Sequence, residues 1–385
     1  MRLIGVELVR VDIPFRHRIR TAVGIHGERG LLFVRVVTDQ GEGWGECGAL
    51  SEGTAVDPPV TAVYDAAVKV AVPRLFTASA ARGGVLPSSG EVAKLFGTTP
   101  ADRYLAAVFE MAVSDMELRA SGQSLAEWLE VGPGFETLPV GAAVGIPEGR
   151  DVGLLLEEVT ALVVAGVGRV RVKIEPGWDI EAVAALRERF GALVLQVDAN
   201  GAYRVGDAEH LARLGAYDVV CLEQPLPPAD LVALAEFRRR IGVAVPICLD
   251  ESLSSPRRVI DAIQYEACQV ACLKPARLGG LRATRVAHAA CVQADVSVFI
   301  GGFFEAGLGR ASNLALAARL HQEMPGLVGD LGDPAGYLSE DPCGYPVVAD
   351  GWVRVPASPG VGNWPDEVTL SELGEDRQWF PATYT

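Results

Sequence analysis

The sequence predicts an α/β protein: a modified (β/α)7β barrel of the TIM type, with an α+β domain capping it. After residue 135, short apolar runs alternate with amphipathic stretches, whereas before it strand-like runs are followed by helical periodicity. Six reference residues in the apolar runs lie 25, 25, 27, 24 and 27 residues apart: Lys173, Asp198, Glu223, Asp250, Lys274 and Gly301. A strand and a helix repeated at such an interval form βα units on a parallel sheet, and seven or eight units favour a closed barrel.

This pattern divides most of the chain into two predicted domains. Residues 1–134 are predicted to form the capping domain, because "LIGVELVRVDIP", "LLFVRVVT" and "EGWGEC" resemble strands and residues 101–120 have helical periodicity. Residues 135–330 are predicted to form the barrel. Its strands are expected in "LPVGAAVGI", "RVRVKIE", "LVLQVDAN", "VVCLEQP", "VPICLDE", "QVACLKP" and "VSVFIGG".

Composition excludes several classes of function. The 385 residues include 34 Lys and Arg against 49 Asp and Glu, and a net charge of −15 argues against a nucleic-acid partner. No apolar run approaches the ~20 residues of a membrane span, and the first residues lack the features of a signal peptide. Seven scattered cysteines without a C-x-x-C pair fit reduced thiols, so we expect a cytoplasmic protein.

Three acidic residues end three consecutive predicted strands, in "VDAN", "LEQP" and "LDES". In a barrel of this kind Asp198, Glu223 and Asp250 converge at the carboxyl ends of the strands, where catalytic residues gather. Three converging carboxylates repel one another unless a cation is present, and hard oxygen ligands suit Mg²⁺. The alternative is that each acid only caps the helix that follows it. Three acids at consecutive strand ends with near-equal spacing make this alternative less favoured.

A basic face on the second predicted strand complements these acids. Alternation places Arg169, Arg171 and Lys173 on one side of "RVRVK". Lys173 and Lys274 lie on strands two and six, on opposite sides of an eight-stranded ring. A divalent cation and the guanidinium of Arg171 favour the neutral amine form of Lys173, which makes it a candidate general base. The alternative is that the lysines form salt bridges with the acids across the barrel.

The order Lys, Asp, Glu, Asp, Lys on strands two to six resembles the muconate-lactonising subgroup of the enolase superfamily. The strings "KIEPGWD", "QVDAN", "LEQPL", "ICLDES", "LKPARLGG" and "GGFFEAGLGRASNLALA" are similar to o-succinylbenzoate synthases that often also racemise N-acylamino acids. The resemblance covers nearly the whole chain. It implies that residues 331–385 form a C-terminal segment that packs back on the cap.

The resemblance also implies roles for the residues at the strand ends. Asp198, Glu223 and Asp250 would bind Mg²⁺, with Mn²⁺ as a substitute. Lys173 would remove the proton next to a substrate carboxylate, giving an enediolate. In the synthase reaction the hydroxyl then leaves in a syn elimination, so one lysine serves both steps and Lys274 stabilises charge. In racemisation the two lysines act on opposite faces of the same carbon.

Further residues are expected to contact the substrate or support the site: Arg171, Asn200, Glu251, Arg277, Gly301, Gly302, Phe303 and Phe304. Arg171 departs from the family, which usually has Lys-x-Lys on this strand, and arginine does not deprotonate. Arg277 matches the motif and would support Lys274 electrostatically, the alternative being a surface cap. Phe303 and Phe304 would line an apolar wall or simply pack against a helix.

Two other stretches bear on substrate choice. Residues 20–30, "RTAVGIHGERG", resemble the family's mobile loop that closes over the barrel mouth. Residues 329–333, "GDLGD", lie near strand eight, where dipeptide epimerases carry Asp-x-Asp, but here the second acid is one residue too far.

The sequence therefore favours a Mg²⁺-dependent lyase, o-succinylbenzoate synthase, with N-succinylamino acid racemase activity as an accompaniment. N-acylamino acid racemisation as the main role is the second hypothesis, and a muconate-type cycloisomerase is the third. A non-catalytic metal-binding barrel is favoured only by Arg171. We expect a small carboxylate as the substrate, a homo-oligomer, and neither nucleic acid nor membrane as a partner.

Overall fold

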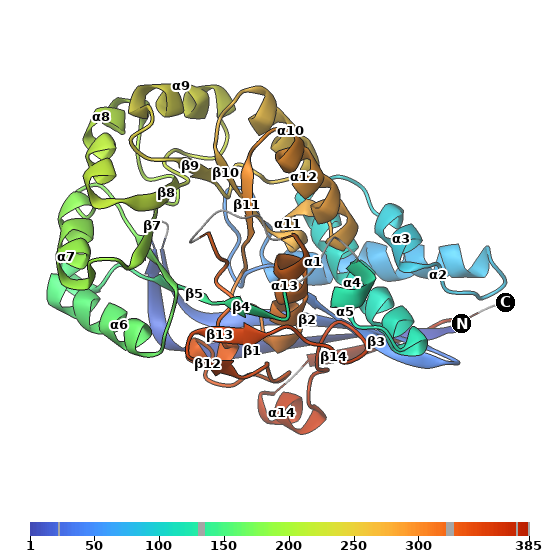
Figure 1. Cartoon of the computed structure of the whole chain (residues 1–385). Helices are drawn as coiled ribbons and strands as arrows, with labels where there is room; N and C mark the ends of the chain where they lie inside the picture. Colours follow the sequence, from blue (N-terminus) through green and yellow to red (C-terminus); the bar gives the residue numbers. More distant parts are fainter. Residues whose placement is uncertain (22–23, 130–134, 321–326, 375, 384–385) are drawn as a thin grey trace.

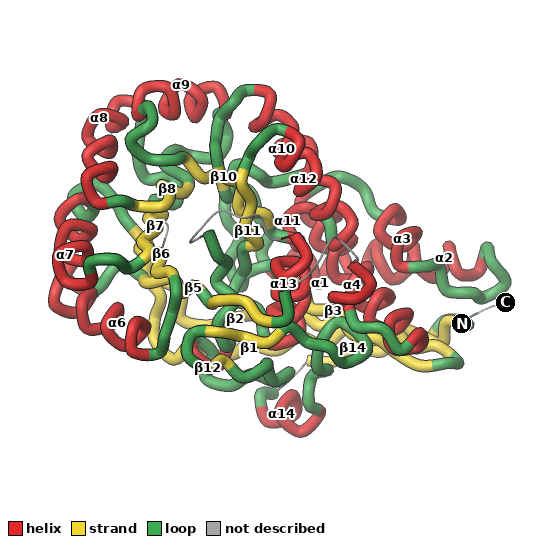
Figure 2. Tube along the Cα trace, in the orientation of Figure 1, coloured by secondary structure: helices red, strands yellow, loops and turns green. Residues whose placement is uncertain are grey.

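The computed structural model describes residues 1–21, 24–129, 135–320, 327–374 and 376–383. Seven parallel strands form one curved sheet in sequence order, and helices surround it on the outside (Figures 1 and 2). Each apolar run predicted as a barrel strand contributes to it, which confirms the predicted fold class. The strands are β5 (Gly141–Val144), β6 (Arg169–Lys173), β7 (Val194–Asp198), β8 (Val219–Glu223), β9 (Ile247–Leu249), β10 (Val270–Leu273) and β11 (Ser297–Ile300).

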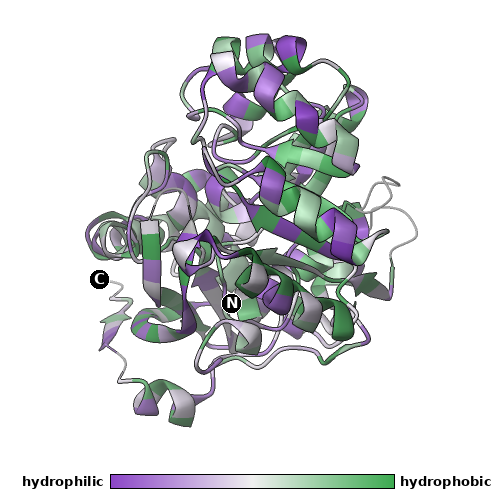
Figure 3. Cartoon of the chain, turned by 90° about the vertical axis from the view of Figure 1, so that its left-hand side faces the viewer, coloured by the Kyte–Doolittle hydropathy of each residue, from purple (hydrophilic) through white to green (hydrophobic). Residues whose placement is uncertain are grey.

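The outer helices have one face on the sheet and one in solvent. Figure 3 shows hydrophobic and hydrophilic residues side by side along them. Several begin at side-chain caps that the sequence provides, such as Asp151, Asp230 and Ser255, each of which accepts backbone N–H groups of the first turn. The helices are α6 (Val152–Val164), α7 (Ile180–Phe190), α8 (Ala208–Leu211), α9 (Leu231–Ile241), α10 (Pro256–Gln264), α11 (Pro275–Leu278), α12 (Leu281–Gln293) and α13 (Gly307–Leu320).

The eighth position of the ring is not a regular strand. Residues 327–331 have no assigned strand, yet Gly141 N donates to Gly329 O (3.0 Å), so this segment sits beside β5. A Cβ at Gly329 would lie 2.3 Å from Ile300 O, so the same glycine also approaches the end of β11. The predicted final strand is therefore replaced by an irregular segment that closes the ring and carries Asp330.

The capping domain is built on a four-stranded antiparallel sheet in the order β14-β1-β2-β3. The C-terminal strand pairs with the first strand, with Gly5 opposite Pro381, as the sequence predicted for the final segment. The domain limits of 134 and 330 stay predictions, and residue 134 lies outside the described residues. The strands are β1 (Leu3–Thr21), β2 (Gly24–Thr38), β3 (Gly41–Cys47) and β14 (Asp376–Pro381).

The long helix of the cap explains the glycines of "GEGWGEC". α4 (Pro100–Ser121) begins at Thr99, whose side chain accepts from Asp102 N, and ends at Gly122 with φ 71°. It packs so closely on β3 that a Cβ at Gly43 or Gly45 would lie 2.2 Å from a carbonyl oxygen of α4. Only glycine permits this approach. The shorter cap helices are α1 (Val60–Ala66), α2 (Val72–Ala80), α3 (Ser89–Val92) and α5 (Leu125–Leu129).

The remaining elements lie at the base of the barrel and after it. A three-stranded sheet in the order β12-β13-β4 joins the chain before β5 to the chain after the barrel. No described helix combines the length and apolarity needed to cross a bilayer. These elements are β4 (Thr137–Pro139), β12 (Val348–Ala349), β13 (Trp352–Arg354) and α14 (Glu367–Glu372).

The stretch predicted as a mobile loop is the tip of a long hairpin. β1 continues to Thr21 and β2 starts at Gly24, which leaves residues 22 and 23 outside the described part. Ile146 N donates to Arg20 O (3.1 Å), and the Arg20 side chain pairs with Glu175 (3.4 Å). These partners follow β5 and β6, so the tip lies at the carboxyl ends of the barrel strands, where the sequence placed it.

Glu46 of β3 joins the cap to the barrel. Its buried carboxylate accepts the N–H groups of Ala306 and Gly309, each at 2.7 Å, at the start of α13. Burial raises the pKa of Glu46 to about 8; the two N–H groups and Arg29 oppose the rise, and the charge of Glu305 adds to it. Glu46 is therefore a pH-sensitive contact between the two domains.

We expect this contact to make stability depend on pH. The pKa of this carboxyl group rises from 4.5 to about 8 on folding. Its contribution to the free energy of unfolding is therefore largest below pH 4.5 and decreases as the pH rises to about 8. The Tm of the protein in chelator should fall between about pH 5 and 8, and it should fall less for Glu46→Gln. Glu340→Gln, at an exposed acid, is the control. Parallel pH curves for all three proteins would contradict the assignment.

Candidate active site

Strand register brings three of the predicted residues into one row. In the parallel ladder Lys173 is opposite Asp198, and Asp198 is opposite Glu223. All three side chains are buried inside the barrel, and Lys173 Nζ donates to Asp198 Oδ2 (2.6 Å). The row runs across β6, β7 and β8 at their carboxyl ends, as the spacing in the sequence predicted.

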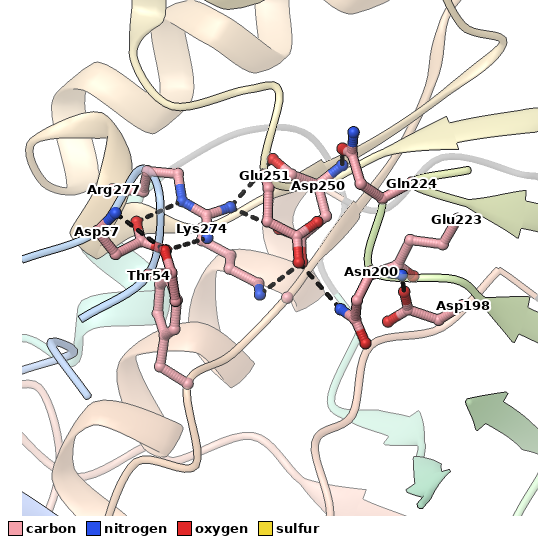
Figure 4. A network of polar contacts seen from close by, with 12 residues as sticks. Thr54, Asp57, Asp198, Asn200, Glu223, Gln224, Asp250, Glu251, Lys274 and Arg277 are labelled. Atoms are coloured by element: carbon pink, nitrogen blue, oxygen red, sulfur yellow. Dashed lines mark hydrogen bonds and ion pairs between the residues drawn. The ribbon is translucent and has the colours of Figure 1, made fainter. Parts of the chain in front are cut away.

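A second group faces this row from β9 and β10. Lys274 Nζ donates to Asp250 Oδ2 (2.8 Å), and Arg277 Nη1 donates to Asp250 Oδ1 (2.6 Å), as Figure 4 shows. The charges of Lys274 and Arg277 outweigh the effect of burial and hold the pKa of Asp250 below its usual range. Asp250 in turn outweighs burial at Lys274 and raises the pKa of that ammonium. In the described structure Lys274 is therefore a proton-bearing group.

Arg277 also ties the site to the capping domain. Its Nε and Nη2 donate to Asp57 at 2.9 and 2.7 Å, and Asp57 accepts a further hydrogen bond from Tyr104 (2.9 Å) (Figure 4). Arg277 is 2% exposed, which rules out the surface cap considered for it. One guanidinium thus connects Asp250 in the barrel with Asp57 in the cap.

The basic face of β6 points into the barrel. Arg171 Nη1 contacts Glu223 Oε1 (2.6 Å) and lies 3.4 Å from Asp198 Oδ2, while its Nη2 pairs with Asp330. Arg169 Nη1 lies 2.9 Å from the other oxygen of Asp330. The alternation in the sequence therefore placed Arg169, Arg171 and Lys173 on the correct face.

The acidic groups fit a hard divalent cation. Burial raises the pKa of Glu223 to about 8; Arg171 opposes this, and the charges of Asp198 and Asp250 add to it. The pKa of Glu223 is thus raised although Arg171 contacts it, and a cation of charge +2 beside Glu223 would favour the carboxylate form. Glu223, Asp198 and Asp250 offer only oxygen ligands, which Mg²⁺ prefers.

Some buried oxygens beside these carboxylates have no hydrogen-bond donor among the described residues. They include Asn200 Oδ1 and Glu251 Oε2, although Asn200 Nδ2 does donate to Glu251 Oε1 (2.9 Å). Burial raises the pKa of Glu251 to about 7, and the charges of Asp250 and Asp198 add to the rise. Unsatisfied buried oxygens need a donor or a cation, so they support the presence of an ion or ordered water here. The two predicted residues thus border the carboxylates.

The geometry of the acids differs in one respect from the prediction. Ligand atoms of Glu223, Asp250 and Cys272 lie within 4.8 Å of one another, whereas Asp198 is turned toward Lys173 and Arg171. Cys272 belongs to a small buried cluster inside the barrel with Cys221 and Cys248. All seven cysteines are buried and free, as expected for reduced thiols.

The residues that follow β11 contact different side chains. A Cβ at Gly301 would lie 3.0 Å from Lys274 Cε, and one at Gly302 would lie 2.6 Å from Glu305 Oε2, so both glycines make room. The Phe303 ring lies 4.4 Å from Lys274 Nζ, a cation–π contact, and so belongs to the site.

Phe304 does not share that position. Its φ of 56° is uncommon for a bulky residue, and its ring packs edge-on against Phe15 (5.4 Å) and Tyr337 (5.5 Å). Arg29 of the cap donates to Phe304 O (3.2 Å). Phe303 therefore lies at the lysine, whereas Phe304 packs in a separate aromatic group, as in the alternative considered for it.

Several residues of the site were not found from the sequence. Gln196 lies two residues before Asp198 on the same face of β7 and donates to Glu223 Oε2, so strand alternation was a usable signal. Asp57 is 220 residues from Arg277, and no local pattern links the two. Asp330 was considered as a substrate ligand, but both its oxygens face arginines. His26 of the hairpin lies within electrostatic reach of Lys173; burial is the main reason its pKa is lowered.

Comparisons with known proteins agree with this architecture. Residues 154–369 match the family described as enolase C-terminal domain-like. The chain is 39% identical to an N-succinylamino acid racemase of Amycolatopsis over 99% of this chain and 100% of that protein. It is 31% identical to an o-succinylbenzoate synthase of Enterococcus faecalis over 97% of this chain and 96% of that protein.

A solved structure has the same fold throughout. A probable mandelate racemase from Alicyclobacillus acidocaldarius superposes with a TM-score of 0.85 at 32% identity, covering 99% of each chain. The family model matches more than half of the present chain, and the relatives match nearly all of it. The chain therefore belongs to the enolase superfamily, in the family of its full-length relatives, the N-succinylamino acid racemases and o-succinylbenzoate synthases.

Proposed function

We propose that this protein moves a proton at the carbon next to a substrate carboxylate and thereby racemises N-succinylamino acids. The observation that carries the proposal is the placement of two lysines around one buried carboxylate cluster. Lys173 ends β6 and Lys274 follows β10, with three strands between them in the sheet. In a ring of eight positions this separation puts the two amines on opposite sides, as inversion of a carbon centre requires.

Asp198, Glu223 and Asp250 would hold Mg²⁺, which supplies charge that stabilises the enediolate form of the substrate. Lys173 Nζ takes the α-proton, and the electron pair of the broken C–H bond moves into the carboxylate. Lys274 Nζ then delivers its proton to the opposite face. Lys274 lies 4.4 Å from the Phe303 ring, which stabilises its ammonium form before the proton is delivered.

Arg277 would act through Asp250 on Lys274. Both cations bind the same carboxylate, one at each oxygen, so Arg277 fixes the orientation of Asp250 and thus the position of the amine. Its contact with Asp57 makes this support depend on the closed arrangement of cap and barrel.

Dehydration to o-succinylbenzoate is the second candidate, favoured by relatives such as the synthase of Geobacillus kaustophilus at 32% identity over 99% of both chains. Here Lys173 takes the α-proton and returns it to the departing hydroxyl, so that the C–O bond breaks and water leaves. The same cluster of residues serves this reaction.

Two assays on the purified protein separate these candidates. L- and D-N-succinylamino acids with apolar side chains are followed by polarimetry and by NMR in D₂O. The substrate of the synthase reaction, a hydroxylated cyclohexadiene carboxylate, is followed by its absorbance. We expect racemisation with α-deuteration in Mg²⁺ and its loss in chelator. Turnover of the cyclohexadiene alone would establish the synthase as the function. Neither turnover nor α-proton exchange would overturn the proposal.

A further inference from the structure

Asp330 lies in the irregular segment that closes the barrel, and its carboxylate is shared between two arginines of β6. Arg169 Nη1 faces Oδ1 at 2.9 Å, and Arg171 Nη2 pairs with Oδ2. Arg169 also donates to Val328 O of the same segment. Residues 328–330 lie beside β5, and these charge-assisted contacts join them to side chains of the next strand, β6.

The guanidinium of Arg171 has a partner on each edge. While Nη2 binds Asp330, Nη1 contacts Glu223 at 2.6 Å and Asp198 at 3.4 Å. The planar fork of arginine permits this bridging, whereas a lysine ammonium is a single point of charge. Arg171 is thereby in direct contact with two of the three carboxylates proposed as metal ligands.

Such a cation beside the ligands competes with a metal ion unless its position is fixed. In the structure one amino group, Nη1, already contacts Glu223 and lies 3.4 Å from Asp198. A guanidinium free to turn would bring Nη2 to these oxygens as well, and Asp330 binds Nη2 and holds it away from them. Its charge is compensated there by two guanidinium groups, so it adds no unpaired acid to the site.

Resting on the proposed function, we propose that Asp330 is a positioning residue: it holds Nη2 of Arg171, so that only Nη1 competes with a divalent cation for Glu223 and Asp198. Asp330 Oδ2 pairs with Arg171, and Oδ1 lies 2.9 Å from Arg169 Nη1, so the charge of this carboxylate is compensated within the barrel. The next acid, Asp333, is exposed and caps a short turn by accepting from Ala335 N (2.9 Å).

The test is a double-mutant cycle with Mg²⁺ binding as the readout, measured by calorimetry without substrate. The proteins are the wild type, Asp330→Asn, Arg171→Met and the variant carrying both changes. Removing a supporting partner of metal ligands typically costs about 10- to 100-fold in metal affinity, and we expect Asp330→Asn to raise the Kd for Mg²⁺ by about tenfold. In the Arg171→Met background the same change should raise it by less than about twofold, because no guanidinium is left to fix. Asp333→Asn, which removes the same charge nearby, should leave the Kd unchanged.

Each outcome decides the matter. An equal effect of Asp330→Asn in both backgrounds would show that it acts only as a remote charge, and no effect in the wild type would also overturn the inference. If circular dichroism shows Asp330→Asn to be unfolded, Asp330→Glu replaces it, since this change keeps the charge but displaces the carboxylate. A wild type that binds no Mg²⁺ would overturn the proposed function and this inference together, whereas binding without coupling would overturn the inference alone.

Discussion

Replacing Lys173 should abolish α-proton exchange in the enantiomer that presents its proton to this amine, while leaving Mg²⁺ binding intact. A positioned general base contributes about 10²- to 10⁴-fold to a reaction, so we expect Lys173→Ala to lose at least about 10²-fold in racemisation and in the exchange of that enantiomer with D₂O. The same loss is expected for dehydration, because both candidate reactions begin with this proton. NMR of the α-proton measures it without depending on which product forms.

A variant that keeps the positive charge distinguishes the role of Lys173 as a base from its role in the ion pair with Asp198. Lys173 Nζ binds Asp198 at 2.6 Å, and removing one partner of a buried pair is strongly destabilising. Lys173→Arg keeps a positive charge beside Asp198 but does not deprotonate, so it should fold and lose exchange of that same enantiomer. Lys69→Ala, at an exposed lysine, is the control for general effects of losing a lysine. If that enantiomer still exchanges in both Lys173 variants, another group is its base.

Much of the active site was predictable because it depends on local rules. Strand alternation determined the faces of Arg171 and Lys173, and the spacing of βα units placed Asp198, Glu223 and Asp250 at neighbouring strand ends. Parallel pairing then makes strand ends meet at one edge of the sheet. These inferences needed no knowledge of how distant segments pack.

The parts that were missed depend on distant packing. The contact of Arg277 with Asp57 requires the cap to dock on the barrel in one orientation. The position of Asp330 follows from a segment that closes the ring without forming a strand, which a periodic pattern does not indicate. The direction of Asp198 is set by its partners Lys173 and Arg171, and rotamers of this kind are decided by neighbouring charges.

Replacing Lys274 should uncouple proton exchange from inversion. Asp250 keeps its contact with Arg277 at 2.6 Å when the lysine is lost, so Lys274→Met leaves no isolated buried charge and retains the volume beside Phe303. In D₂O, the enantiomer whose α-proton faces Lys173 should still exchange, because Lys173 removes the proton and returns deuterium from the same side.

The opposite enantiomer presents its proton to the missing amine. It should exchange at least about 10²-fold more slowly than in the wild type, and racemisation should fall by a similar factor in both directions. Lys173→Arg should show the mirror image, with exchange limited to the other enantiomer. A two-base reaction requires this asymmetry. Equal loss of exchange for both enantiomers in Lys274→Met would instead show that Lys274 is needed only for its charge, and the assignment of inversion to this pair would be wrong.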